Sequence, residues 1–421
     1  MRTRTFNTLT PYGETELERV LWMALFAKGF HGRRGLPYVL VGDPGTGKTS
    51  VIERLSRVAG LYQQTLNGSL RPPQDFLGLP TSATLERTEA NAHLFPEHLQ
   101  SLTFAEYAPF SYAVRAALAG QSMLFFDEAN TAPEDVQAAM LRVVLEGVIG
   151  ELKLPPGVRM MLAMNRPDDT SGASDFSAAM GNRVGWLDWH GGSVDQFANY
   201  LVGGSTSATP TTFDPADLAD AVDAIWGDAW AEAAGVISGF LHRRPEFFRK
   251  RLGRDVPSGP FPSDRSWEFA TRALAGCIVF GLGENEQALA CSAAVGADAW
   301  AELAAWLRSA DLPDPGQLLD GAVTYHHKPQ RLDRTAAVLD ACLALVLGDL
   351  IVDRKAKRVS ALWELLLRLV QDHPAATDLA LRPIVQLCTL KLMQRSPDAY
   401  KLIGLITPML IKANIDIGSF A

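Results

Sequence analysis

Cysteine is scarce in this chain of 421 residues, which contains only four. They are scattered, mostly among apolar neighbours, at Cys277, Cys291, Cys342 and Cys388. No two of them form a CxxC pair, which excludes the chemistry that such pairs support. The pattern predicts buried structural thiols, which suit a reducing cytosol.

Long apolar segments are also missing. The longest, Val338–Val352, is interrupted by Asp340 and Asp349, and a membrane-spanning helix needs about 20 apolar residues. The first residues, from Met1 onward, lack the apolar core of a signal peptide. We therefore expect a soluble, cytoplasmic protein with no membrane insertion.

An excess of positive charge is absent as well. The 39 Lys and Arg residues face 47 Asp and Glu, a net charge of −8, so nothing in the overall balance indicates a nucleic-acid binder. Low-complexity disorder is excluded because 47% of the residues are hydrophobic and only 20% are charged. The chain can bury a core, and its length indicates more than one domain.

Short apolar runs alternate with helical periodicity in the first part of the chain. The runs, expected as buried strands, are Tyr38–Val41, Met123–Phe126 and Met160–Met164. Helices are expected over Glu14–Phe30, Thr49–Val58 and Pro133–Glu146. This alternation predicts an α/β domain with a parallel sheet.

The sequence changes character after Asp188. A small, polar stretch at Gly203–Thr212 is typical of a linker, and Pro313–Gly316 marks a second break. Between and beyond these breaks we expect helices only. The predicted domains are therefore an α/β nucleotide-binding core over residues 1–192, a helical lid over 193–312 and a helical C-terminal segment over 313–421. Whether the last is a docking module or completes the core stays open.

A glycine-rich loop lies between the first expected strand and the second expected helix. It fits the pattern GxxxxGK[ST] and consists of Gly42, Asp43, Pro44, Gly45, Thr46, Gly47, Lys48, Thr49 and Ser50. Glycines allow successive backbone N–H groups to turn toward a polyphosphate at a helix N-terminus. Lys48 is expected to reach the β- and γ-phosphates and Thr49 to ligate Mg²⁺.

Polar residues end the other two expected strands. Asp127 and Glu128 follow one apolar run, and Asn165 follows the next. Downstream of a phosphate loop, Asp127 is expected in the Mg²⁺ shell, with Glu128 as the base that deprotonates the attacking water. Asn165 would position that water at the carboxyl edge of the sheet.

Taken together, these motifs resemble an AAA+ ATPase of the MoxR-like branch, among its dynein-related and magnesium-chelatase-type relatives. Asp127–Leu141 resembles that branch's run after the metal carboxylates, Gln74–Gly78 its segment between the nucleotide motifs, and Phe261–Trp267 its second-sensor region. The resemblance covers residues 14–280. It implies a P-loop NTPase core with a helical lid and an all-helical C-terminal extension, acting on ATP with Mg²⁺.

The resemblance also assigns arginines and an assembly. Arg183 matches the finger that reaches the nucleotide of the neighbouring subunit, and Arg166 is its rival. Arg265 matches the second sensor, which contacts the γ-phosphate of its own subunit. Because one catalytic group comes from a neighbour, we expect a homo-oligomer, typically a hexameric ring.

By resemblance, the substrate of such a ring is a protein client, engaged with a von Willebrand factor A-domain partner in chaperone-like remodelling. Two alternatives stay open, a nucleic-acid motor or loader and a nucleotide-gated scaffold. Residues 74–105 and Gly150–Gly157 form either client-contacting hairpins or plain connections. The basic cluster Arg354–Arg358 is either a solvated helix end or a docking patch for an acidic partner.

Overall fold

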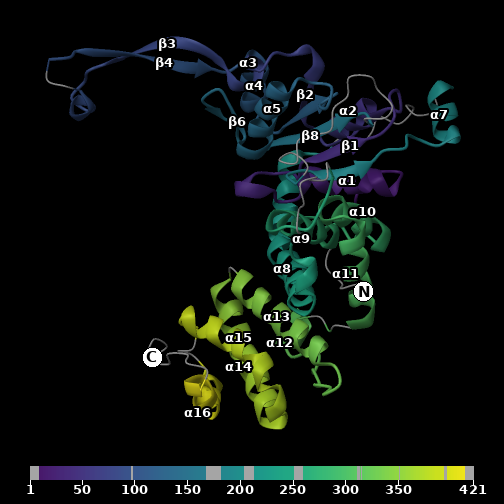
Figure 1. Ribbon diagram of the computed structural model, residues 1–421, viewed down its shortest axis with the longest axis vertical. Coiled ribbons are helices and arrows are strands. Elements are labelled where there is room, and N and C mark those ends of the chain that lie inside the picture. Colours follow the sequence, from purple (N-terminus) through teal and green to yellow (C-terminus); the bar gives the residue numbers. More distant parts are fainter. Residues whose placement is uncertain are drawn as a thin grey trace. The chain divides into compact units, whose positions relative to one another are not determined.

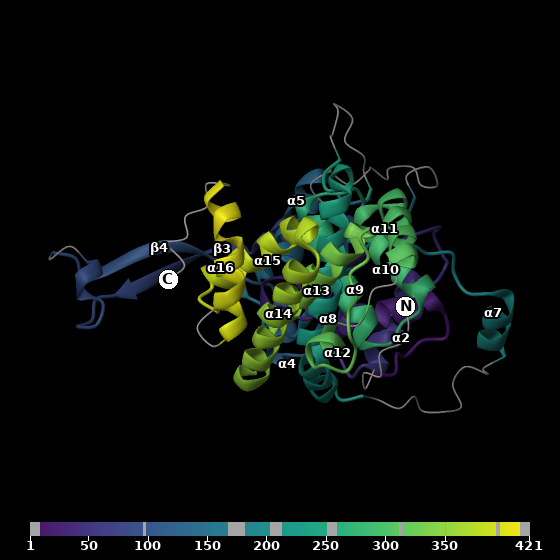
Figure 2. The same cartoon turned by 90° about the horizontal axis from the view of Figure 1, so that it is seen from below.

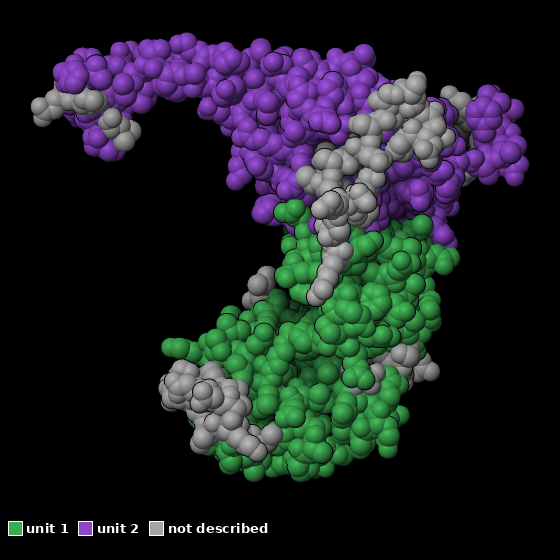
Figure 3. All heavy atoms as spheres, viewed as in Figure 1, with its two compact units in different colours: residues 1–11, 221–253, 261–421 green, residues 12–220, 254–260 purple. Residues whose placement is uncertain are grey.

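The computed structural model describes residues 9–95, 98–166, 182–202, 213–250, 259–310, 313, 315–349, 351–392 and 396–412. The chain forms two compact units, shown in purple and green in Figure 3. The α/β unit contains residues 12–220 and 254–260, and the helical unit contains residues 1–11, 221–253 and 261–421. The three-part division of the chain at residues 192 and 312 stays a prediction.

A five-stranded, all-parallel sheet forms the centre of the α/β unit, in the order β2-β5-β8-β1-β9. Its strands are β1 (Tyr38–Val41), β2 (Tyr62–Asn67), β5 (Ser122–Asp127), β8 (Val158–Met164) and β9 (Gly185–Asp188). The strands β1, β5 and β8 were expected, and β2 and β9 were not. The arrangement confirms the predicted α/β fold with a parallel-sheet core.

Helices pack on the sheet because successive strand residues are buried on opposite faces. Val39, Leu124 and Leu162 share one apolar cluster with α4 (Ser111–Ala119) and α5 (Glu134–Glu146). Their strand neighbours Leu40 and Phe125 are buried as well, as expected for a parallel sheet covered on both faces. Two further helices of this unit are α1 (Glu16–Phe26) and α2 (Lys48–Val58).

Helix α1 is shorter than the helix expected over Glu14–Phe30. The backbone leaves the helical region at Ala27, and the chain then folds back so that the N–H of Gly35 donates to Ala27 and that of Leu36 donates to Ala24. This reversal delivers the chain to β1. The helical spacing of apolar residues continues in the sequence beyond Phe26, although the backbone turns at Ala27. The pattern therefore predicted a helix that was too long.

An insertion carries an exposed hairpin between α3 (Gln74–Leu77) and α4. Its strands, β3 (Leu79–Glu86) and β4 (Ser101–Ala108), pair antiparallel from Leu79 opposite Ala108 to Glu86 opposite Ser101. In Figure 1 it extends away from the sheet of its own unit. A second, short hairpin follows α5, with strands β6 (Val148–Ile149) and β7 (Leu152–Lys153). The hairpins span residues 79–108 and 148–153 and so overlap the expected segments 74–105 and 150–157 without matching their bounds. Contact of either hairpin with a client stays a prediction.

The helical unit has no strand among its described residues. Its helices are most of α8 (Pro215–Arg243), and α9 (Asp264–Val279), α10 (Glu284–Val295), α11 (Ala297–Ala310), α12 (Pro315–Leu319), α13 (Leu332–Gly348), α14 (Val352–Asp372), α15 (Thr377–Thr389) and α16 (Pro397–Lys412). Figure 2 shows α13 and α14 beside α8. Within the described ranges, no helix combines the length and apolar content required to cross a bilayer.

Helices α8 and α13 approach closely because small residues face one another. A Cβ built on Gly235 would lie 2.4 Å from Cα of Ala341, and one on Gly239 would lie 3.0 Å from Cβ of Ala337. Glycine at these positions lets the two helix backbones come close. This packing unites the residues before and after the break at 313–316 in one compact unit.

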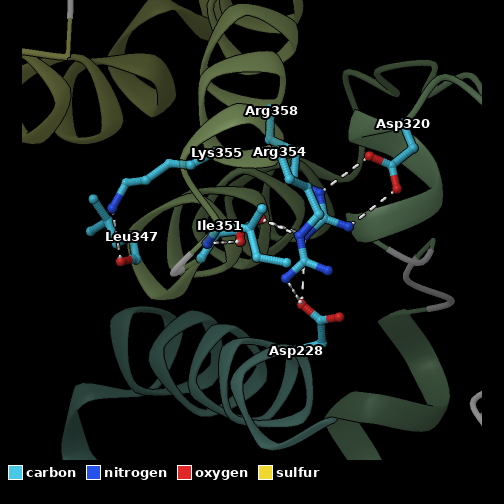
Figure 4. A network of polar contacts seen from close by, with 8 residues as sticks. Asp228, Asp320, Leu347, Ile351, Arg354, Lys355 and Arg358 are labelled. Atoms are coloured by element: carbon cyan, nitrogen blue, oxygen red, sulfur yellow. Dashed lines mark hydrogen bonds and ion pairs between the residues drawn. The ribbon is translucent and has the colours of Figure 1, made fainter. Parts of the chain in front are cut away.

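The basic cluster Arg354–Arg358 lies within an ion network rather than forming a free basic patch (Figure 4). Arg358 is buried and pairs with both carboxylate oxygens of Asp320 at 3.1 and 3.2 Å, and with Asp349 at 3.1 Å. Arg354 binds Asp349 at 2.8 Å, and both arginines lie 3.5 Å from Asp228 on α8. The network therefore ties α14 to α8 and to the end of α12.

Candidate active site

Three strands of the sheet end side by side at one edge. The phosphate loop follows β1, Asp127 ends β5, and Asn165 follows β8. In the sheet order, β8 lies between β5 and β1. The topology therefore places Asn165 between the lysine of the loop and the two carboxylates, at the edge where open α/β sheets bind ligands.

The phosphate loop runs directly into α2. Gly45 and Gly47 have φ values of +75° and +84°, a left-handed conformation that only glycine adopts readily. Asp43 and Pro44 are exposed at the tip, and the Thr46 hydroxyl donates to the carbonyl of Asp43 at 2.7 Å. Ser50 is exposed on the first turn of α2. The loop thus presents its backbone at a helix N-terminus, as an anion site requires.

Lys48 is buried and makes three hydrogen bonds. Its Nζ donates to the carbonyl oxygens of Gly42 (2.7 Å) and Asp43 (2.9 Å) and to Oδ1 of Asn165 (3.0 Å). Burial lowers the pKa of Lys48 from its ordinary value, and the nearby carboxylates, Asp127 foremost, oppose that shift. The ammonium is thereby held at the sheet edge by neutral acceptors.

Thr49 and Asp127 meet across the edge. The Thr49 hydroxyl donates to Oδ2 of Asp127 at 2.5 Å. A hydroxyl and a carboxylate oxygen are the hard ligands that Mg²⁺ prefers, and this ion usually keeps several waters besides one or two carboxylates and substrate phosphates. The pair therefore fits Mg²⁺. The described residues include no group of three or more His, Cys, Asp or Glu suited to a metal.

Glu128 has an unusual backbone, with φ at +51°. Its N–H donates to Oδ1 of Asp127 at 2.9 Å. Its carboxylate Oε2 accepts from Nδ2 of Asn67 (3.0 Å) and from the hydroxyl of Ser69 (2.9 Å). Asn67 and Ser69 were not identified from the sequence, because Asn67 ends and Ser69 follows a strand whose polar residues gave no strand signal.

Asn165 is fixed by a second asparagine. Asn130, fully buried after the two carboxylates, donates to the Asn165 carbonyl at 2.8 Å and accepts from its N–H at 3.3 Å. The Asn165 side chain is left facing Lys48. Asn130 also escaped the sequence analysis, although it lies within the quoted segment Asp127–Leu141.

The three arginines occupy different places. Arg166, next to Asn165, lies 3.7 Å from Asp188 at the end of β9, and both side chains are more than a third exposed. Arg183 is half-buried just before β9. Arg265 is exposed on the first turn of α9, in the other unit. The α/β unit therefore assembles Lys48, Thr49, Asp127, Glu128 and Asn165, with Arg166 beside them.

The phosphate loop and four of the five sheet strands lie in a span that is similar to a known domain family. Residues 37–184 match the AAA domain of the dynein-related subfamily, a span that contains the phosphate loop and the strands β1, β2, β5 and β8 and ends before β9. No curated protein matches the chain. The crystal structure of a protein proposed to be an ATPase, from Cytophaga hutchinsonii, is similar at 12% identity with a TM-score of 0.41, over 69% of this chain and 88% of that chain.

Proposed function

We propose that this chain hydrolyses ATP with Mg²⁺ as an AAA+ motor of the MoxR-like branch. One observation carries the proposal: the Thr49 hydroxyl and the Asp127 carboxylate meet at 2.5 Å beside a lysine-bearing phosphate loop. Glu128 and Asn165 flank that pair. The groups proposed to bind the phosphates, the Mg²⁺ ion and the attacking water thus lie at one sheet edge.

The residues divide the reaction between them. Backbone N–H groups of the loop and the Lys48 ammonium bind the phosphates, while Asn165, bonded to Lys48, orients the attacking water. Glu128 accepts the proton of that water. Mg²⁺, held by Thr49 and Asp127, would neutralise charge on the phosphate oxygens. The contacts of Glu128 with Asn67 and Ser69 set where its carboxylate lies before the reaction.

We further propose that hydrolysis needs a ring, typically a hexamer, in which Arg183 acts on the neighbour's nucleotide. The ion pair of Arg166 with Asp188 favours a role for Arg166 within its own subunit. Arg265 is proposed as the second sensor. Arginine fingers of this kind contribute about 10³–10⁵ in rate.

The long hairpin supports a protein client rather than a nucleic acid. The strands β3 and β4 contain no lysine or arginine, so they offer nothing that would neutralise a phosphate backbone. Residues paired directly across the hairpin share a face, and Phe104, which is opposite Ala83, therefore lies on the same face as Leu79 and Leu85. The side chains of Leu79, Leu85 and Phe104 are 46%, 39% and 46% exposed. A von Willebrand factor A-domain partner is proposed by resemblance alone.

The first experiment measures ATPase rate per subunit against protein concentration. A trans-acting Arg183 predicts a steep rise, and a flat dependence would contradict the ring. R183A should abolish hydrolysis while nucleotide binding persists. R166A should not combine lost hydrolysis with retained nucleotide binding. K48A is the control for the site itself: if it hydrolyses ATP at the wild-type rate, the proposed function is wrong.

A second experiment separates the classes of client. The hydrolysis-blocked E128Q variant should retain bound partners in a pull-down, and F104S in the same background should release them. Salt-sensitive stimulation of the ATPase by DNA would instead favour a nucleic-acid motor. A scaffold would keep its cellular function in E128Q, whereas a motor would lose it.

A further inference from the structure

Trp189 contacts the phosphate loop although no motif marks it. It follows β9, and it is only 7% exposed. Its indole N–H donates to the carbonyl oxygen of Thr46 at 2.9 Å, and its backbone N–H donates to the carbonyl of Val41 at 2.7 Å. A single residue thus bonds both the last residue of β1 and the far turn of the loop.

The backbone around Trp189 also touches the loop. A Cβ built on Gly42 would lie 2.1 Å from the carbonyl oxygen of Trp189, so no larger residue fits at position 42 while Trp189 keeps its place. On the other side, a Cβ on Gly191 would lie 3.4 Å from Thr46. The segment 189–191 therefore encloses the loop at its beginning and at its far turn.

The bond from Trp189 differs from the bonds that Lys48 makes to the loop. Lys48 donates to the carbonyls of Gly42 and Asp43, and a lysine that turns toward a phosphate gives these bonds up. The indole bond involves neither Lys48 nor any group that faces the phosphates. It can hold the turn at Thr46 both before and after nucleotide binding.

We propose that Trp189 is a positioning residue that holds the Thr46 turn of the phosphate loop in the shape that binds the nucleotide phosphates. This rests on the proposed function of the site. A preorganised loop loses less conformational freedom on binding, so its affinity is higher. Trp189 touches no phosphate itself and acts through the carbonyl of Thr46.

The test compares W189F with W22F by calorimetric titration of ADP and by thermal unfolding without nucleotide. Trp22 is the matched control, because its indole N–H is buried and has no hydrogen-bond partner in the described part of the chain. A net hydrogen bond corresponds to roughly a three- to tenfold change. We expect the Kd for ADP to rise by about that factor in W189F, with kcat at saturating ATP close to wild type, and to stay unchanged in W22F.

Replacement of Trp189 by benzothienylalanine, which keeps the ring size and exchanges N–H for sulfur, should weaken ADP binding in the same way, and it covers the case in which W189F misfolds. If both variants bind ADP like the wild type, or if W22F weakens binding equally, Trp189 has no positioning role. Failure of the wild type to bind ADP would instead contradict the proposed function itself.

Discussion

Cations and carboxylates meet in both units of this molecule, but they are arranged differently. At the sheet edge, Lys48 bonds two carbonyls and an amide, while Asp127 and Glu128 bond a hydroxyl and neutral side chains. Among the described residues, none of the three joins an ion pair. In the helical unit, Arg358 and Arg354 are instead bound by Asp228, Asp320 and Asp349.

The difference is the one expected between charges that take part in the proposed reaction and charges that stabilise the packing of helices. Neutral partners leave the charge of Lys48 and Glu128 available to a substrate. In the helical unit each charge is cancelled by a neighbour: burial alone would raise the pKa of Asp349, but the bond from Arg354 and the surrounding cations hold that pKa below its ordinary value. Substitutions in the first cluster should therefore alter rate, and substitutions in the second should alter stability.

The largest effect is expected for E128Q. An amide cannot accept the proton of water, and general-base catalysis contributes about 10²–10⁴ in rate. We expect kcat to fall by that factor while the Kd for ATP and the melting temperature stay near wild type. Steady-state ATPase assays and calorimetry check this. Retention of more than a tenth of the rate would remove Glu128 from its proposed role.

The counterpart in the helical unit is R358M. The substitution removes one of the two arginines that bind Asp349, which is 3% exposed and keeps the bond from Arg354. Hydrogen bonds to charged groups contribute about 1.5–3 kcal/mol, and we expect a loss of that size. Urea denaturation followed by circular dichroism measures the loss. The control is R368M on the same helix, whose pair with Glu364 is about half exposed and should contribute at most about 1 kcal/mol. Equal losses of unfolding free energy in R358M and R368M would show that the buried network contributes no more to stability than an exposed ion pair.

A smaller effect tests the helix contact that supports the network. G235A places a methyl group against Ala341 at 2.4 Å, and such overpacking costs about 1–3 kcal/mol. On the same helix, a Cβ on Gly227 would meet only the Gly348 carbonyl, at 3.8 Å. G227A should therefore stabilise the protein by up to about 1 kcal/mol, since alanine is the better helix former. Stabilisation by both substitutions would show that α8 and α13 are not closely packed.

The smallest expected effect depends on pH. Burial and the positive charge of the nearby His373 lower the pKa of His327 from its ordinary value of 6.5. The unfolded chain therefore binds the proton more readily, so the stabilisation is present above pH 6.5 and is lost as the pH falls below it. H327Q should lose less melting temperature than the wild type between pH 7.5 and pH 5, by a few degrees at most. Equal losses of melting temperature in H327Q and the wild type over this pH range would contradict the prediction.

Buried strands could be predicted from the sequence, and edge strands could not. The runs at β1, β5 and β8 are continuous and apolar because both faces of a parallel sheet are covered. Strand β2 contains Gln63, Gln64 and Thr65 and is only partly buried at the sheet edge, so it lacks that signal. Strand β9 has four residues, including a glycine and an aspartate.

The site residues that could be predicted lie at buried strands, and those that could not be predicted lie at edge strands. Lys48, Thr49, Asp127, Glu128 and Asn165 adjoin buried strands and were identified from motifs; their catalytic roles stay predictions. Asn67 and Trp189 adjoin the two edge strands and were missed. The basic cluster on α14 was misjudged for another reason: its partners Asp228 and Asp320 lie on other elements, and only the tertiary fold brings them together.

The left-handed backbone of Glu128 sets the stability of this protein against its proposed activity. A residue with a side chain held at φ of +51° is strained by about 1 kcal/mol or more, and glycine would relieve that strain. Selection for thermal stability alone would therefore favour glycine at position 128. A glutamate in this strained position is what the proposed role of Glu128 as the base predicts, because glycine would remove the carboxylate together with the strain.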